Sequence, residues 1–126
     1  MENVIVTKSK NFAIRIVNAY KYLTAEKNEY IMSKQLLRSG TSIGANVKEG
    51  IRGQTKPDFY AKLNIALKEA SEAEYWLEIL YETDYIDKKL YESINSDCEE
   101  IIKLLVSITK TQKNNSALRI PNSELK

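Results

Sequence analysis

Apolar residues recur every three or four positions along most of the chain, which is the spacing of one face of an α-helix. The pattern predicts four helices, at about residues 8–27, 30–50, 57–83 and 87–113. Ser9, Thr55 and Asp87 are the expected N-caps of the first, third and fourth helices. Pro57 suits the first turn of the third helix, where its missing N–H costs nothing. No segment shows a competing strand pattern, so the predicted fold class is all-α.

Each predicted helix carries a continuous apolar seam. The seam of the third helix consists of Phe59, Leu63, Ala66, Ala70, Ala73, Leu77 and Leu80, and that of the fourth of Leu90, Ile94, Cys98, Ile101, Leu105 and Ile108. Four such helices with short connections predict an antiparallel up-down four-helix bundle over residues 1–113. Residues 114–126 contain two adjacent Asn, Pro121 and little periodicity, so we expect a flexible C-terminal tail.

Composition excludes several kinds of site. The chain of 126 residues is one domain by length and contains no His and one Cys. A histidine base, a histidine-ligated zinc, a haem-binding histidine and an intrachain disulfide are therefore excluded. The seam position of Cys98 predicts a buried small hydrophobe rather than a reactive thiol. No apolar run is long enough to span a membrane and the start lacks a signal-peptide pattern, so we expect a cytoplasmic protein without membrane partners.

Charge is distributed unevenly, although the net charge is only +2. Residues 1–57 carry a net +6, residues 58–100 a net −8 and residues 101–126 a net +4. A front half this basic suggests an anionic partner, either nucleic acid or an acidic protein surface. The alternative is that the basic helices lie beside the acidic helices of the same chain.

The second predicted helix contains a run of small residues, Ser39-Gly40-Thr41-Ser42-Ile43-Gly44-Ala45. Gly40 and Gly44 are four residues apart and face the same side, where they would let another helix approach closely. The alternative is that the helix breaks into a loop here. Leu36, Ile43, Val47 and Ile51 form the arc that we expect to face the core.

Basic residues of the second helix form a separate narrow arc. We call Lys34, Arg38, Lys48 and Arg52 the basic strip; Thr41 and Ala45 lie between its members. A positive strip with small residues in its middle would let a phosphate backbone lie close. Arg15 and Lys21, together with Lys8, extend the candidate nucleic-acid-binding set on the first helix. A solvated face or ion pairing between subunits explains the same pattern, and nothing indicates sequence-specific base reading.

Two segments carry a family resemblance. The strings LLRSGTSIGANVKEG at Leu36–Gly50 and DFYAKLNIALKEASEAEYWLEIL at Asp58–Leu80 resemble the four-helix-bundle family that includes the 23S rRNA intervening-sequence proteins. The similarity extends from about Phe12 to Ile108, although many members have proline at the position of Gly44. The resemblance implies a bundle that assembles into a homo-oligomeric ring, a pentamer. The related accessory variability determinant of diversity-generating retroelements binds nucleic acid with a reverse transcriptase, which implies a nucleic-acid-processing protein as a further partner.

The third helix has a second apolar strip away from its seam. Ile65, Trp76 and Ile79 would be exposed in a lone bundle, and such a strip often marks an interface. We therefore predict that these three residues contact another copy of the chain. A wide bundle core or the C-terminal tail would also cover them.

Catalysis has one candidate arrangement. Glu69 and Glu72 on the third helix, facing Asp97 and Glu100 on the fourth, could hold Mg²⁺ for nucleotide hydrolysis. A region this acidic produces such spacings by chance, so the hydrolase is a distant alternative. The leading hypothesis is a non-enzymatic oligomer, without cofactor or metal, that binds RNA or DNA through the basic strip. A protein-protein assembly module without nucleic-acid binding is the second hypothesis.

Overall fold

The computed structural model describes the backbone of residues 3–124 and the side chains of residues 3–111. Within this range the chain forms helices and no strand, which confirms the all-α fold class. The helices are α1 (Val4–Glu26), α2 (Met32–Ile51), α3 (Lys56–Glu82) and α4 (Lys88–Glu124). None of these helices, over the described residues, combines the length and the hydrophobicity that crossing a lipid bilayer requires.

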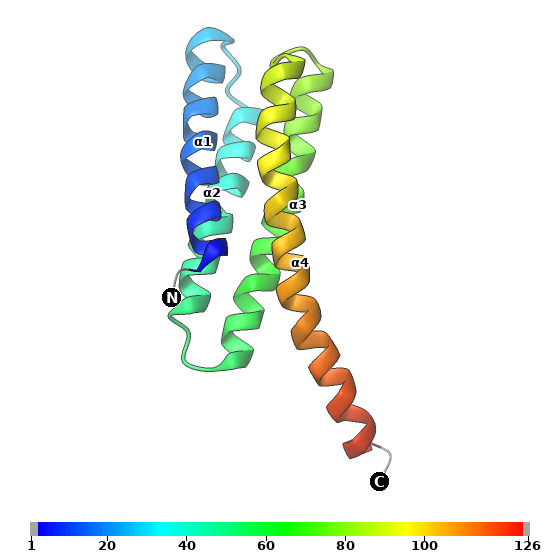
Figure 1. Cartoon of the computed structure of the whole chain (residues 1–126). Coiled ribbons are helices and arrows are strands. Elements are labelled where there is room, and N and C mark those ends of the chain that lie inside the picture. Colours follow the sequence, from blue (N-terminus) through cyan, green and yellow to red (C-terminus); the bar gives the residue numbers. More distant parts are fainter. Residues whose placement is uncertain (1–2, 125–126) are drawn as a thin grey trace.

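The four helices lie side by side, and their connections stand at alternate ends of the molecule (Figure 1). Each helix packs against the next in sequence, and α1 also packs against α4. The α2–α3 interface is the most extensive of the four and the α1–α4 interface the least. This arrangement is that of a four-helix bundle around one core.

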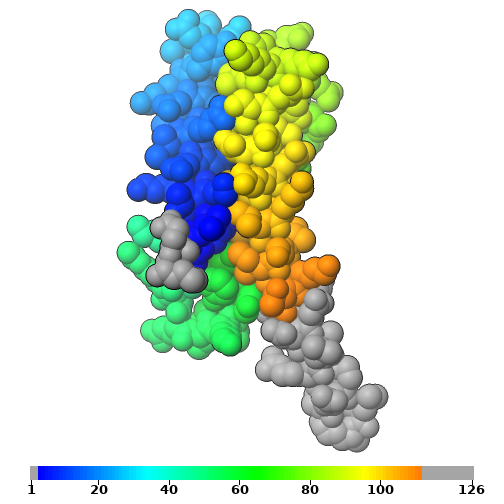
Figure 2. All heavy atoms as spheres, in the orientation of Figure 1, coloured from blue at the N-terminus to red at the C-terminus, as the bar shows by residue number. Residues whose placement is uncertain are grey.

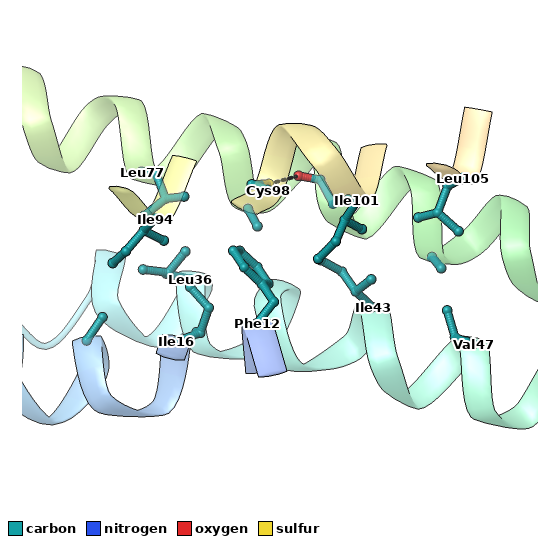
Figure 3. Close-up of a cluster of buried hydrophobic side chains, with 14 of the residues drawn as sticks. Phe12, Ile16, Leu36, Ile43, Val47, Leu77, Ile94, Cys98, Ile101 and Leu105 are labelled. Atoms are coloured by element: carbon teal, nitrogen blue, oxygen red, sulfur yellow. Dashed lines mark hydrogen bonds between the residues drawn. The ribbon is translucent and has the colours of Figure 1, made fainter. Parts of the chain in front are cut away.

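The apolar seams meet in this core (Figure 3). Phe12 and Ile16 of α1, Leu36 and Ile43 of α2, and Leu77 of α3 are all almost completely buried. The interior of each predicted seam is confirmed, whereas Phe59, Leu90 and Ile108 near the ends are half-buried. The prediction for Ile51 was wrong: this last residue of α2 is 46% exposed, because the helix ends there and the chain turns toward α3.

Cys98 lies in this core as the sequence predicts. Its thiol is fully buried and donates to the carbonyl oxygen of Ala70 at 3.4 Å. Burial raises the pKa of the Cys98 thiol to about 12, and the nearby carboxylates of Glu74, Glu99 and Asp97 act in the same direction. The thiol is therefore a packed core group.

The helix starts follow two of the three predicted caps. Thr55 Oγ1 accepts from the backbone N–H of Asp58 and Asp87 Oδ1 from that of Leu90, as expected. Ser9 does not cap α1, which begins five residues before it behind Asn3. Ser9 is instead buried within α1, and its hydroxyl donates to the carbonyl oxygen of Val6.

The connection between α1 and α2 carries a buried carboxylate. Glu29 is 7% exposed and accepts hydrogen bonds from the backbone N–H groups at the start of α2, those of Ile31, Met32 and Ser33. These are the N–H groups that a helix leaves without an internal partner. Burial alone would raise the pKa of Glu29, but these hydrogen bonds outweigh it and lower the pKa.

The small residues of α2 do not break the helix; they let α1 approach it. A Cβ added at Gly40 would lie 2.8 Å from Cγ1 of Ile16, and one at Gly44 would lie 3.3 Å from the carbonyl oxygen of Ser9. The expected close helix contact is therefore confirmed, and α1 is the helix that makes it.

The helical backbone of α4 reaches Glu124, beyond the end predicted near Lys113. Asn carries only a weak penalty in a helix, so the two adjacent Asn residues do not terminate it by themselves. The predicted flexible tail, residues 114–126, lies outside the residues whose side chains are described, and its flexibility stays a prediction.

Candidate nucleic-acid interface

The basic strip lies on the outer face of α2, and Arg52 is the residue that caps the end of this helix. Lys34, Arg38, Lys48 and Arg52 are all exposed, as is Ala45 between them. The hydroxyl of Thr41 donates to the carbonyl oxygen of Leu37 in its own helix, so the polar group is already satisfied. The middle of the strip is thus free of long side chains other than that of Arg38.

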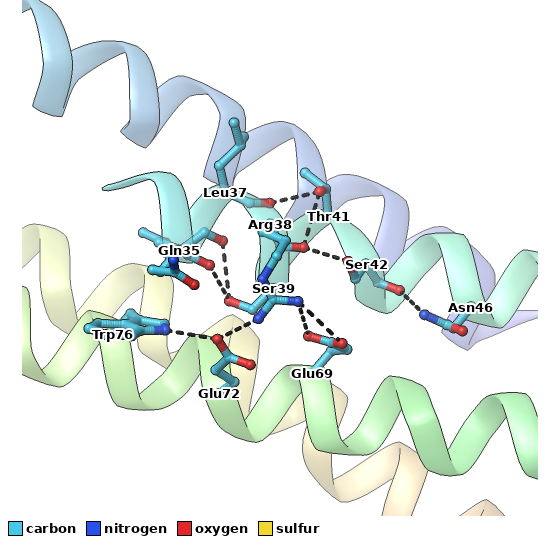
Figure 4. Close-up of polar contacts among 11 residues, drawn as sticks. Gln35, Leu37, Arg38, Ser39, Thr41, Ser42, Asn46, Glu69, Glu72 and Trp76 are labelled. Atoms are coloured by element: carbon cyan, nitrogen blue, oxygen red, sulfur yellow. Dashed lines mark hydrogen bonds and ion pairs between the residues drawn. The ribbon is translucent and has the colours of Figure 1, made fainter. Parts of the chain in front are cut away.

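Arg38 is held by carboxylates of its own chain (Figure 4). Its Nη1 lies 3.2 Å from Oε1 of Glu69, and its Nη2 lies 2.5 Å from Oε2 of Glu72, both on α3. The hydrogen bond from Arg38, followed by one from the Trp76 indole, lowers the pKa of Glu72. In the free protein Arg38 is therefore an ion-paired residue, which the helical spacing of α2 alone does not reveal.

The other three members of the basic strip carry no such partner. Among the described residues, no carboxylate lies within ion-pair distance of Lys34, Lys48 or Arg52. The one acidic residue of α2, Glu49, instead binds Lys62 of α3 at 2.9 Å. These three positive charges are available to an anion from solution.

The structure separates the candidate cations of α1. Arg15 lies 2.9 Å from Asp97 of α4 and also donates to the carbonyl oxygen of Ser93, while Lys8 lies 2.9 Å from Glu100 of α4. Both therefore lie along the α1–α4 groove and do not join the basic strip. This groove encloses about 170 Å³, and Figure 2 shows α1 and α4 side by side on the face where it lies.

Lys21 remains exposed and has no ion pair among the described residues. Lys10 shares these properties and lies eleven residues, about three helical turns, before Lys21 on the same face of α1. The sequence interpretation omitted Lys10. Its eleven-residue spacing from Lys21 is the signal that could have identified it.

The carboxylate pairs proposed for metal binding do not face one another. Glu69 and Glu72 contact Arg38 of α2, whereas Asp97 and Glu100 contact Arg15 and Lys8 of α1. The two pairs therefore lie in different interhelical grooves. In the described part of the chain no three acidic or Cys side chains are grouped to hold a metal ion. The four-carboxylate arrangement of the distant hydrolase alternative was therefore wrong, because α3 and α4 turn the two pairs toward different neighbouring helices.

The second apolar strip of α3 is only partly available for contacts. Ile65 is 40% exposed, and Trp76 and Ile79 are half-buried. The Trp76 indole N–H donates to Oε2 of Glu72 at 3.0 Å, so this side chain is anchored within its own subunit. Tyr75, which is 53% exposed, packs edge-on against the indole and adds to the apolar surface.

Unpaired negative charge gathers between α3 and α4. A groove of about 400 Å³ is lined by Ser71, Glu74, Tyr75, Glu78, Tyr91, Asn95 and Glu99. Burial, followed by the nearby Glu99 and Glu78 carboxylates, raises the pKa of Glu74. No Lys or Arg of the described residues pairs with these three carboxylates. The unpaired carboxylates of this groove thus lie on α3 and α4, whereas the basic strip lies on α2.

Comparison with known proteins identifies the family. A crystal structure of a protein of unknown function from Bacteroides thetaiotaomicron, described as a member of the S23 ribosomal protein family, is 60% identical in sequence. The match covers 84% of this chain and 98% of the other, with a TM-score of 0.83. Comparison with curated proteins gives no match. The family model of the 23S rRNA-intervening sequence protein matches residues 1–107. The chain therefore belongs to the 23S rRNA-intervening sequence protein family.

Proposed function

We propose that the protein is a non-enzymatic, homo-oligomeric nucleic-acid-binding protein that acts in the cytoplasm. It holds the phosphate backbone of RNA or DNA on the outer face of α2, without reading base sequence. The observation that carries the proposal is the set of three exposed cations on that face, Lys34, Lys48 and Arg52, which lack a carboxylate partner among the described residues. The family name, which refers to 23S rRNA, agrees with an RNA ligand.

The dimensions of the basic strip suit a nucleic-acid strand. From Lys34 to Arg52 the helix advances about 27 Å at 1.5 Å per residue. A stacked strand rises about 3.4 Å per nucleotide, so this length corresponds to about eight nucleotides. The small side chains of Thr41 and Ala45 leave room for the backbone to approach α2 closely. Lys10 and Lys21 on α1 offer further charge to a longer ligand.

Assembly into an oligomer would place several copies of the basic strip on one particle. We propose an up-down antiparallel bundle that forms a ring of identical subunits, with Ile65, Trp76 and Ile79 at the subunit contacts; the family resemblance implies five copies. The alternate placement of the interhelical connections agrees with the up-down order (Figure 1). A ring would present several basic strips to one nucleic acid, which raises the effective concentration of the second and later contacts.

Fluorescence anisotropy with a labelled single-stranded RNA of about 20 nucleotides tests the proposal. Wild-type protein should bind at low salt, and the triple variant Lys34→Ala/Lys48→Ala/Arg52→Ala should lose most of that affinity because phosphate contacts dominate binding. The matched control is Lys68→Ala/Lys89→Ala/Lys103→Ala, which removes the same charge from exposed positions on α3 and α4. Equal affinity for a scrambled RNA is expected. No binding at low salt, or equal losses in both variants, would refute the proposal.

A protein-protein assembly module is the second candidate function. The observation that favours it is the acidic α3–α4 groove, whose charge complements the basic strip of another copy. In that case the triple basic-strip variant should dissociate the oligomer in the absence of RNA, and high salt should do the same. Light scattering with and without 1 M NaCl separates the two functions. If the basic strip binds nucleic acid instead, the triple variant should still form the same oligomer as the wild type in the absence of RNA.

A further inference from the structure

Arg38 occupies the centre of the basic strip yet is held by α3. It lies one helical turn after Lys34, and its side chain is 49% exposed. Its Nη1 and Nη2 donate to two different carboxylates, those of Glu69 and Glu72. A phosphate group offers the same kind of paired acceptor oxygens to a guanidinium. The two carboxylates therefore occupy the donors that a phosphate on the strip would use.

The two carboxylates differ in what they retain when Arg38 leaves. Glu72 also accepts from the indole N–H of Trp76, so it keeps a protein donor (Figure 4). Arg38 is the only partner of Glu69 among the described residues, and the Glu69 side chain is 21% exposed. Ion pairs as exposed as these contribute little net stability, because water solvates the separated charges well. Exchange of Arg38 from carboxylate to phosphate is therefore feasible without disturbing the core.

We infer that Glu69 and Glu72 limit the affinity of the protein for nucleic acid by competing with phosphate for Arg38. This inference rests on the proposed function and adds the residues that set its strength. In the free protein the carboxylates mask Arg38, and binding recruits it only after a phosphate displaces them. The affinity of the wild-type protein for nucleic acid therefore depends mainly on Lys34, Lys48 and Arg52, and Arg38 contributes little to it.

The test is the double variant Glu69→Gln/Glu72→Gln. Glutamine keeps the size of the side chain and an acceptor for the Trp76 indole, but it removes the charge that holds Arg38. Single-stranded RNA affinity should rise by about two- to fivefold, the factor that one exposed ion pair is worth. The slope of log affinity against log salt should steepen by about 0.7, the value for one more phosphate contact on a single strand.

Two controls assign the gain to Arg38. The variant Glu74→Gln/Glu78→Gln removes the same charge from α3 on the side of the α3–α4 groove, and it should give a smaller gain with an unchanged salt slope. Adding Arg38→Ala to the Glu69→Gln/Glu72→Gln variant should abolish the gain, whereas Arg38→Ala alone should change wild-type affinity little. An equal gain in the Glu74→Gln/Glu78→Gln control, or a gain that survives without Arg38, would overturn the inference.

Trp76 gives an independent readout, because it is the only tryptophan of the chain. RNA that contacts Arg38 should change the indole fluorescence of the Glu69→Gln/Glu72→Gln variant more than that of the wild type, and adding Arg38→Ala should abolish the difference. Melting temperatures close to that of the wild type verify that the variants fold. The single variant Glu69→Gln repeats the affinity measurement with a smaller change to the protein. If wild type binds RNA and the glutamine variants bind no better, only this inference fails. If neither binds, the proposed function fails as well.

Discussion

At the scale of single residues, Gly40 sets how closely α1 and α2 approach. An added Cβ would lie 2.8 and 2.9 Å from Cγ1 and Cγ2 of Ile16, whose side chain is fully buried. These atoms branch directly from the Ile16 Cβ and cannot swing away as the end of a long side chain would. Glycine costs about 1 kcal/mol relative to alanine inside a helix. At position 40 this cost is offset because the missing side chain lets Ile16 pack against the backbone of α2.

Gly40→Ala should destabilise the protein despite its better helix propensity. Overpacking a core costs about 1–3 kcal/mol, which outweighs the propensity gain. Denaturant unfolding measures the change in free energy. The double variant Gly40→Ala/Ile16→Ala should lose less than the sum of the two single variants, because the smaller side chain makes room for the new methyl group. A more stable Gly40→Ala protein would show that α1 does not pack as described.

Glu29 gives the stability of the bundle a pH dependence. Its pKa is lowered in the folded state, so its stabilising effect is present above the unfolded value near 4.5 and is lost as pH falls through the lower folded value. Glu29→Gln should reduce stability at pH 7 by about 0.5–2 kcal/mol, the range for loss of a helix cap. Thermal melts from pH 7 to 3 should show this difference shrinking, whereas the exposed Glu26→Gln should behave as wild type. A difference that stays constant with pH would contradict the cap.

At the scale of elements, α3 presents a different chemistry on each edge. Glu69 and Glu72 bind Arg38 of α2, while Glu74 and Glu78 face the groove beside α4 without a cationic partner. Ile65 and Ile79 lie outside the buried seam of this helix and carry the predicted subunit contact. Different faces of α3 therefore contribute to the core, hold Arg38 and form the proposed subunit contact.

Ile65→Asp/Ile79→Asp should weaken self-association, because both charges would be desolvated in a subunit contact. Light scattering on purified protein should show the assembly of the wild type reduced to smaller species. Ile14→Asp is the control for a charge at an exposed apolar position elsewhere, since Ile14 is 51% exposed on α1, a helix that does not pack against α3. A monomeric wild type, or an oligomer unaffected by the double variant, would exclude this contact.

Some of these features follow from sequence and others do not. The seams are predictable because burial imposes a 3.6-residue period on each helix, and Thr55 and Asp87 are predictable because capping is local. The partners of Arg38 and Arg15 depend on how neighbouring helices are rotated and aligned, which a single helical wheel does not contain. The burial of Ser9 likewise follows from the close contact with α2 rather than from its local sequence.

At the scale of the whole molecule, charge is distributed unevenly over the surface, although the net charge is only +2. Ion pairs between neighbouring helices neutralise Lys8, Arg15, Arg38 and Lys62. The unpaired cations of the described region that remain on α2 are those of the basic strip, and the unpaired carboxylates of the α3–α4 groove lie on the other helix pair. This distribution favours a polyanion at the basic strip over the α3–α4 groove.

The salt dependence of RNA binding tests the central claim most directly. For single-stranded RNA each phosphate contact contributes about 0.7 to the slope of log affinity against log salt, so loss of three contacts should flatten it by about 2. We predict that Lys34→Ala/Lys48→Ala/Arg52→Ala shows this flattening, while Lys68→Ala/Lys89→Ala/Lys103→Ala keeps the wild-type slope. A basic-strip variant whose slope equals that of wild type would contradict phosphate binding by the outer face of α2.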